Sequence, residues 1–241
     1  MHKVSLGTAC LLFSILSLHA QSPLEKGLQS INRTSAEAIV EFLADDELQG
    51  REAGMHGSRV AARYIVSRLK QDGIRPLDEN GYYQSFEACS KERQQRRRWQ
   101  VHPDSVAILK QGTHRSLKMN NVLAYIPGRR SDEYVIIGAH FDHLGVDETL
   151  ANDKIYNGAD DNASGVSAVL QIAHAFILSG QKPLRNVIFA FWDGEEKGLL
   201  GSKYFVQHCP FLKQVKSYLN FDMIGRNNKP ERPQHVVYFY T

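Results

Sequence analysis

Three short apolar runs constrain the fold of this chain more than any other feature. Residues 122–126, 134–137 and 187–191 are nearly continuous stretches of aliphatic, β-branched and aromatic side chains. Strands with both faces buried have this composition, because helices cover both sides of their sheet. An apolar helical pattern over residues 166–178, closed by Gly180, separates the second run from the third. We therefore predict an α/β fold of three layers, αβα, with a mostly parallel mixed central sheet.

Weaker periodic patterns extend this prediction on both sides. A capping box formed by Thr34 and Glu37 predicts that a helix begins there. Residues 86–120 give mixed signals, and we make no prediction for them. An amphipathic pattern predicts a helix over residues 60–73 that ends near Gly73. After the third apolar run, a helix is predicted near residues 202–206 and a strand near residues 218–221.

Length and charge limit the class of protein. A chain of 241 residues is long enough for one large α/β domain with a complete core. Its net charge of +3 is too small to indicate a nucleic-acid partner. Much of the local basic excess lies in residues 91–98, which we interpret as a solvated surface segment.

Residues 1–20 resemble a secretory signal peptide. Lys3 precedes an apolar run over residues 9–18, and Ala20 is a small residue at the expected cleavage point. The run is too short to cross a bilayer, which takes about 20 apolar residues. We therefore expect an exported, periplasmic or secreted protein without a membrane span, whose single domain covers residues 21–241. Export would permit a disulfide between Cys89 and Cys209, for which two cysteines alone give weak support.

Acidic and imidazole side chains follow the predicted strands. In an open α/β sheet, ligands bind beyond the carboxyl ends of the strands, so these side chains should meet. A set of imidazoles and carboxylates without thiolates is typical of zinc in a hydrolytic site. The candidates at strand ends are His140, Asp142, Glu195, Glu196 and Asp222, and Asp160 and Asp161 lie on the turn before the helix at 166–178.

Each of these segments has an ordinary structural interpretation when it is taken alone. The acidic stretch at 193–196 is compatible with a charged turn, and Asp160 with a helix cap. All four segments, however, close consecutive core elements of one predicted sheet. This coincidence favours a metal site.

The four segments resemble metallopeptidase family 28, the co-catalytic di-zinc aminopeptidases, which are grouped with the glutaminyl cyclases. Residues 42–51, 61–65 and 121–128 are similar to the stretches that precede the metal site in that family. The resemblance covers residues 34–241. The loop at 88–118 is its least typical part and is too short for the protease-associated domain that some members carry.

The resemblance implies a role for each metal ligand. His140 and Asp222 would bind the first zinc, Glu196 would bind the second, and Asp161 would bridge the two. Asp161 is preferred to Asp160 because the family's bridging aspartate directly precedes an asparagine, often through a cis peptide bond.

The remaining roles concern the reaction. Glu195 would be the general base that activates a metal-bridged water, Asp142 would orient His140, and Asp160 would support the ligands. The function implied is an exopeptidase that hydrolyses the first peptide bond at the N-terminus of a peptide or protein.

The sequence departs from the family pattern in one respect. The second zinc of the family also takes a histidine well downstream of the position that Asp222 matches, and here only His235 follows. His235 precedes an apolar run at 236–240, whereas ligands follow strands. We expect His143 and His208 to be surface or supporting residues. The domain is therefore expected to be truncated at its C-terminus and its activity to be in question.

Two other functions stay open from the sequence. A glutaminyl-peptide cyclotransferase would use one zinc and transfer an acyl group without water. A non-catalytic peptide- or metal-binding domain would keep the fold without hydrolysis. The His-x-Asp-His segment at 140–143 and the Asp-Asp-Asn-x-Ser-Gly segment at 160–165 favour the peptidase. The sequence makes no prediction of the oligomeric state.

Overall fold

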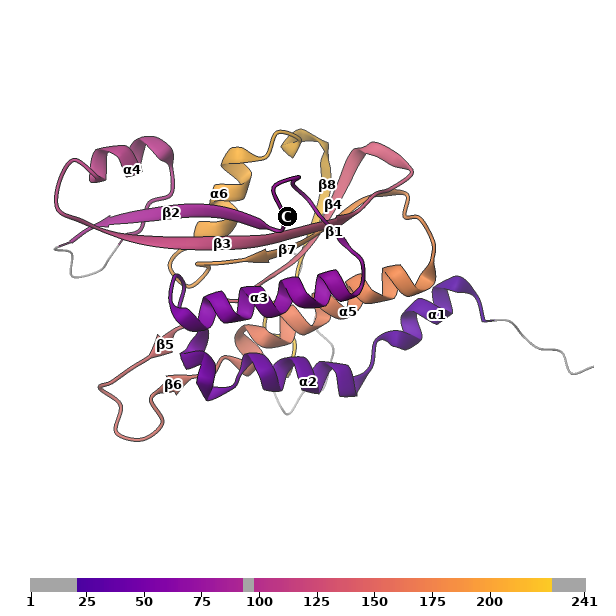
Figure 1. Cartoon of the computed structure of the whole chain (residues 1–241), viewed down its shortest axis with the longest axis horizontal. Coiled ribbons are helices and arrows are strands. Elements are labelled where there is room, and N and C mark those ends of the chain that lie inside the picture. The colour runs from indigo at the N-terminus through magenta and orange to yellow at the C-terminus, as the bar shows by residue number, and fades with distance from the viewer. Residues whose placement is uncertain (1–20, 93–97, 227–241) are drawn as a thin grey trace, which may run out of the picture.

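The computed structural model describes residues 21–92 and 98–226 (Figure 1). The predicted signal peptide at 1–20, most of the basic run and the segment 227–241 lie outside the described residues. His235 and the apolar run that follows it belong to that last segment.

A six-stranded sheet forms the centre of the molecule, with strand order β1-β3-β7-β4-β8 and β2 paired to β3. β4 is parallel to both β7 and β8, whereas β3 runs antiparallel to β7. The sheet is thus mixed, and its parallel part consists of the three strands that we predicted to end in ligands. The strands are β1 (Arg75–Pro76), β2 (Tyr83–Lys91), β3 (His114–Ile126), β4 (Arg130–His140), β7 (Arg185–Trp192) and β8 (Val215–Asn220).

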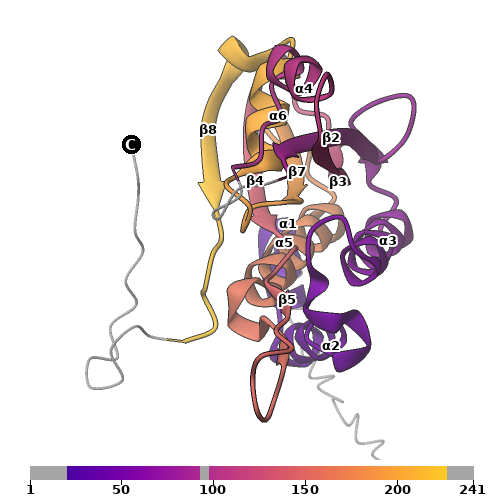
Figure 2. The same ribbon diagram turned by 90° about the vertical axis from the view of Figure 1, so that its left-hand side faces the viewer.

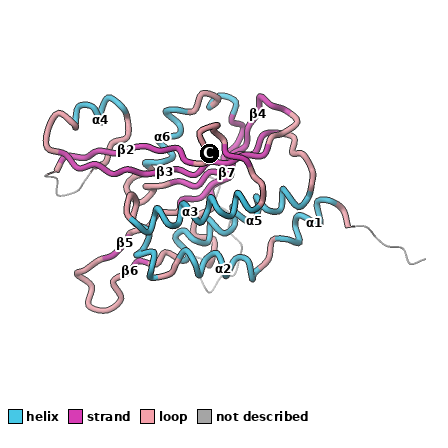
Figure 3. Tube along the Cα trace, in the orientation of Figure 1, coloured by secondary structure: helices cyan, strands magenta, loops and turns pink. Residues whose placement is uncertain are grey.

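Helices cover both faces of this sheet. Figures 1 and 2 show α1, α2, α3 and α5 on one face and α6 on the other, which confirms the predicted αβα layers. A small hairpin of β5 and β6 projects beyond α2 (Figure 3). The helices are α1 (Pro23–Ser30), α2 (Arg33–Leu43), α3 (His56–Gln71), α4 (Pro103–Leu109), α5 (Gly165–Ser179) and α6 (Leu200–His208). The short elements are η1 (Asp46–Arg51), β5 (Gly145–Val146), β6 (Ile155–Tyr156), the π-helical turn η2 (Ala159–Ser164) and η3 (Leu212–Gln214).

The strand β7 is buried on both faces. Phe189 and Phe191 belong to the large apolar cluster beneath α2, α3 and α5. Ile188 and Trp192 belong to a second cluster on the opposite face, which Phe205 of α6 closes. Successive side chains of a strand point to opposite faces, so a continuous apolar run fills two cores at once. The prediction of a doubly covered strand is confirmed.

Element ends follow local chemistry. α5 ends at Gly180 with φ of 63°, the left-handed conformation that glycine adopts without steric penalty, as predicted. The predicted start of α2 is wrong, because the helix begins at Arg33 and its cap is Asn32, whose Oδ1 accepts the Ser35 N–H at 2.9 Å.

The free thiols of Cys89 and Cys209 are not joined.

One helical run among the described residues, Ala159–Ser179, is long and apolar enough to cross a membrane. It contains α5, which packs against β4 and β7 on one side and against α1 and α2 on the other. This packing accounts for its apolar character, because it is the central helix of the core.

A close approach of α3 to η1 depends on Gly57. A Cβ atom at that position would lie 1.7 Å from the carbonyl oxygen of Leu48. Gly112, in the turn after α4, has open space around it. The contact at Gly57 matters for the site because η1 ends at Arg51.

We predict that Gly57→Ala destabilises the protein by roughly 1–3 kcal/mol, the usual cost of overpacking. A loss of stability would be informative, because alanine normally stabilises a helix by about 1 kcal/mol relative to glycine. Gly112→Ala is the matched control and should be neutral or stabilising by up to about 1 kcal/mol. Urea unfolding followed by circular dichroism measures both, and equal stability of the two variants would contradict the packing argument.

Candidate metal centre

The predicted ligands converge at one edge of the sheet. His140 is the last residue of β4, the pair Glu195 and Glu196 follows β7, and Asp222 follows β8. These strands are parallel neighbours in register, with His140 opposite Trp192, so their carboxyl ends reach the same edge. The turn η2 brings Asp161 to this edge from the start of α5.

A first group of donor atoms consists of His140, Asp161 and Asp222. The Nε2 atom of His140 lies 3.0 Å from Oδ1 of Asp161 and 3.8 Å from Oδ1 of Asp222. One ligand atom from each residue lies within 4.8 Å of the other two. This is the set that the family resemblance implies for the first zinc.

A second group consists of His143, Asp161 and Glu196, again within 4.8 Å of one another. Nδ1 of His143 lies 2.7 Å from Oε1 of Glu196 and 4.0 Å from Oδ2 of Asp161. Asp161 thus directs one carboxylate oxygen to each group. We expected His143 to be a surface or a supporting residue, and its 9% exposure excludes the surface position. His208 is exposed, and its ring contacts the Tyr204 carbonyl.

The donor chemistry fits zinc. Each group offers one imidazole and two carboxylates, and a catalytic zinc takes three protein ligands and keeps one position open. The side chain of His140 is 2% exposed, whereas Asp161 and Asp222 are 34% and 37% exposed. The carboxylate side of the cluster therefore faces solvent.

His140 is held in one orientation by Asp142. Nδ1 of His140 lies 3.1 Å from the Asp142 carbonyl oxygen, so Nε2 is the nitrogen that faces the carboxylates. Burial lowers the pKa of His140, but hydrogen bonds to Asp142, Asp161 and Asp222 outweigh burial and raise it to about 12. Without a metal, the imidazole therefore carries a proton that balances the surrounding negative charge.

Asp142 also joins the ends of β4 and β7. Its carboxylate is fully buried and accepts the backbone N–H of Glu195 at 3.0 Å and that of Glu196 at 3.3 Å. The two glutamates are thereby fixed relative to His140. Burial raises the pKa of Glu195; the charge of His140 opposes this rise, and the nearby carboxylates of Asp142, Glu196 and Asp222 add to it. A raised pKa suits a carboxylate that exchanges protons near neutral pH.

Asn162 and Asp160 fix the segment around Asp222. The Asp161–Asn162 peptide bond is cis, the geometry that the resemblance implies at this position. Asn162 donates from Nδ2 to the Phe221 carbonyl at 2.9 Å. The Asp160 carboxylate turns the other way, accepting the Gly225 N–H at 2.8 Å. The two aspartates therefore have distinct positions. Asp161 faces the imidazoles, and Asp160 faces the chain after Asp222.

A buried arginine connects the loops that carry the ligands. The Arg51 side chain is fully buried. Its guanidinium donates to the carbonyls of Phe141 at 2.8 Å, Asn157 at 2.6 Å and Gly158 at 2.9 Å, and also to that of Leu43. Burial lowers the pKa of Arg51 to about 10, so it stays charged at neutral pH.

Arg51 is the last residue of the segment 42–51 that resembles the family, and the sequence indicates no separate role for it. The sequence gives only a weak indication that this arginine is buried, because a single arginine in a polar loop is usually exposed. Only its contacts with carbonyls 90 to 107 residues later in the chain reveal its function.

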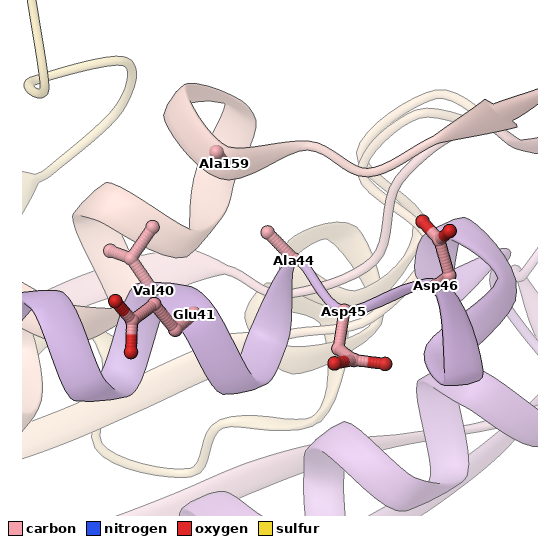
Figure 4. Close-up of a pocket in the computed structure, with 6 residues that line it drawn as sticks. All are labelled: Val40, Glu41, Ala44, Asp45, Asp46 and Ala159. Carbon is pink, nitrogen blue, oxygen red and sulfur yellow. The ribbon is translucent and has the colours of Figure 1, made fainter. Parts of the chain in front are cut away.

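A separate open pocket of about 560 Å³ lies beside the end of α2 (Figure 4). Val40 and Ala44 point toward Ala159 across it, while Asp45 points to the opposite side. None of the predicted site residues lines this pocket, and it contains no imidazole. The donor groups at the strand ends are therefore the better candidate for chemistry.

Asp193 is a buried acid beneath the cluster. Its Oδ1 accepts the Ser58 hydroxyl at 3.1 Å and its Oδ2 the Asn120 N–H at 3.1 Å. Burial and the charge of Asp142 raise the pKa of Asp193 from 3.8 to about 7.

We predict that Arg51→Met destabilises the metal-free protein by at least about 3 kcal/mol, because several buried carbonyls lose their donor and each costs about 1–3 kcal/mol. Arg51→Lys should also be strongly destabilising, since an ammonium group lacks the guanidinium's planar array of donors. Arg33→Met, which removes an exposed pair with Glu37, is the control and should change little. Urea unfolding midpoints measure the three variants. Wild-type stability in Arg51→Met would contradict a linking role.

We predict that Asp193 makes the metal-free protein less stable as pH rises from about 4 to about 7. A folded-state pKa above the unfolded value means that the folded state binds more protons in this window, so the free energy of unfolding falls as pH increases. Asp193→Asn should flatten this decline, and the exposed Asp104→Asn should not. Urea unfolding at pH 4.5 and 7.0 tests this, and an unchanged slope in Asp193→Asn would contradict it.

Comparison with known proteins agrees with this geometry. Residues 121–236 match the sequence profile of peptidase family M28. The chain is 37% identical over 122 residues to leupeptin-inactivating enzyme 1 of Streptomyces exfoliatus, covering 49% of this chain and 24% of that protein. It is 36% identical over 135 residues to the probable lipoprotein aminopeptidase LpqL of Mycobacterium tuberculosis, covering 54% and 24%. The aligned region thus spans about a quarter of these relatives' length.

Solved structures share the fold. The aminopeptidase from Aneurinibacillus sp. strain AM-1 has a TM-score of 0.56 at 16% identity, over 84% of this chain and 73% of that one. A Zn-dependent exopeptidase from Parabacteroides distasonis has a TM-score of 0.57 at 19% identity, over 82% and 63%. Porphyromonas gingivalis glutaminyl cyclase has a TM-score of 0.53 at 23% identity, over 80% and 61%. At such identities the likeness concerns the fold alone. The sequence match makes residues 121–236, which carry both donor groups at the strand ends, similar to peptidase family M28.

Proposed function

We propose that this chain provides the catalytic domain of a zinc-dependent aminopeptidase, which hydrolyses the first peptide bond of peptide or protein substrates. The observation that carries the proposal is the position of Asp161, whose two carboxylate oxygens face two different donor groups. A carboxylate shared in this way is suited to bridging two metal ions. The aminopeptidase names of several relatives support the same reaction.

The first zinc would be held by His140, Asp161 and Asp222, and the second by Asp161 and Glu196 together with a further donor. Bound zinc lowers the pKa of a coordinated water and polarises the scissile carbonyl. The donor set fits this ion, since it offers imidazole and carboxylate ligands and no thiolate.

Glu195 is the proposed general base. Its backbone is fixed through Asp142, and its raised pKa allows it to take a proton from the attacking water and to pass that proton to the leaving amine. Neighbouring side chains at a strand end point in different directions. Glu196 can therefore contribute to the metal site while Glu195 serves the water.

We also propose that the protein is exported. The signal-peptide pattern at residues 1–20 supports this, as does the name of the mycobacterial relative, a probable lipoprotein aminopeptidase. The substrates would then be peptides met outside the cytoplasm.

Glutaminyl cyclisation is the second candidate, because the cyclase from Porphyromonas gingivalis shares the fold. The resemblance implies one zinc for that reaction, and the two donor groups that share Asp161 favour two. The products separate the reactions. Release of a free amino acid supports the peptidase, whereas a cyclised N-terminal glutamine without release would support the cyclase.

We predict that Glu195→Gln lowers the turnover of an N-terminal aminoacyl substrate by about 10²- to 10⁴-fold, the usual contribution of a general base. The zinc content should stay the same, because Glu195 is not a proposed ligand. Glu37→Gln, on the exposed face of α2, is the control and should keep full turnover. Metal analysis and amino-acid release are measured on the same samples. Loss of zinc from Glu195→Gln would show that the residue binds metal, which contradicts the assignment.

A further inference from the structure

We propose that Asn121 of β3 is a positioning residue for the general base Glu195. Residues 193–201, the glutamate loop, connect β7 to α6 and carry Glu195 and Glu196. The buried carboxamide of Asn121 joins the two ends of this loop. This inference rests on the proposed function, because it takes Glu195 as the base, and it adds a residue that lies outside the metal site.

The glutamate loop closes on itself through backbone hydrogen bonds. At its ends, the N–H of Gly201 donates to the Asp193 carbonyl at 3.0 Å. Within the loop, the N–H groups of Gly198 and Leu199 each donate to the Glu195 carbonyl at 2.8 Å. The backbone of Glu195 therefore belongs to a closed unit, and its position depends on where the two ends of the loop are held.

Asn121 contacts both of these ends. It lies beside the end of β7, because its neighbour Val122 is opposite Phe191 in the antiparallel pair of β3 and β7. Oδ1 of Asn121 accepts the N–H of Asp193 at 3.2 Å, and Nδ2 donates to the carbonyl of Gly201 at 2.9 Å. One side chain thus binds the first and the last residue of the loop.

The Asn121 side chain is held tightly in this position. It is fully buried, and Nδ2 also donates to Oε1 of Gln84 at 2.9 Å. Both N–H groups and the oxygen of the carboxamide are therefore used, and a rotated side chain would leave buried polar groups unpaired. The contact is also close, since a Cβ atom at Gly201 would lie 2.1 Å from Oδ1 of Asn121.

The two strands that flank β7 each supply a side chain that holds the glutamate loop. β7 lies between β3 and β4 in the sheet. Asn121 binds the loop ends from β3, and Asp142, just after β4, accepts the N–H groups of Glu195 and Glu196. A general base must lie within hydrogen-bond reach of the proton that it takes. A displacement of about 1 Å caused far from the reacting atoms can lower a rate about 100-fold.

A role in stability alone is the alternative, and Asn186 near the start of β7 is the matched control. This asparagine is also buried, at 5% exposure. Its Oδ1 accepts the N–H of Gly128 at 2.9 Å, and its Nδ2 donates to the Ser131 carbonyl at 2.9 Å. Leucine, which is similar in size, removes such bonds at either position. Both substitutions should lower stability, but only the one at Asn121 should affect the glutamate loop.

The experiment compares Asn121→Leu and Asn186→Leu in the full chain. Urea midpoints should fall for both. With zinc added, Asn121→Leu should lower kcat and kcat/KM for an N-terminal aminoacyl substrate by the same factor, about 10- to 100-fold. Without zinc, amide hydrogen exchange of residues 193–201 should become faster in this variant. Asn186→Leu should keep the wild-type turnover and the wild-type exchange of the loop. Asn121→Ser and Asn186→Ser provide the same comparison if a leucine variant does not fold.

The other outcomes are distinguishable. Wild-type turnover and loop exchange in a folded Asn121 variant would overturn the inference. An equal loss of turnover in the Asn186 variant would reduce the effect to stability and overturn it as well. A wild type that releases no amino acid would overturn the proposed function instead, and hydrogen exchange of the metal-free variants would still decide whether Asn121 positions the loop.

Discussion

Concentrated negative charge at one edge of the sheet is the constraint on which the rest of the structure depends. Asp142, Asp161, Glu195, Glu196 and Asp222 meet where β4, β7 and β8 end. Carboxylates so close repel one another unless positive charge or hydrogen-bond donors lie beside them. In the metal-free chain a protonated His140 and the buried guanidinium of Arg51 supply part of that charge. Metal ions would supply the remainder.

Backbone hydrogen bonds give the cluster its geometry. Asp142 holds the turn after β7 against the end of β4, and Asn162 holds the chain beside Asp222. Arg51 joins the loop after β4 to the turn before η2 through carbonyl groups. Each support acts on the backbone of a ligand-bearing loop, so the ligand side chains stay free to bind. A site of this kind requires such positioning because small displacements of the donors reduce metal affinity.

The main elements were predictable because their signals are local. The apolar run that became β7 is long and uniform, and α5 has a strong apolar pattern closed by Gly180. His140, Glu196 and Asp222 could be named as candidates because each directly follows such a run. The region at 86–120 could not be predicted. There β2 and β3 pair over nine residues, and this pairing, which local sequence does not encode, determines their conformation.

The sequence by itself determined the order of the main strands and helices between residues 122 and 221 and the kinds of side chain at the strand ends, because hydrophobic periodicity and donor chemistry are properties of short segments. Tertiary structure alone decided the contacts that the sequence did not indicate. It turned His143 inward beside Glu196, directed the two oxygens of Asp161 to two imidazoles and buried Arg51 among distant carbonyls. These contacts join residues up to about a hundred positions apart. Their geometry depends on packing of the whole core, which no local pattern specifies.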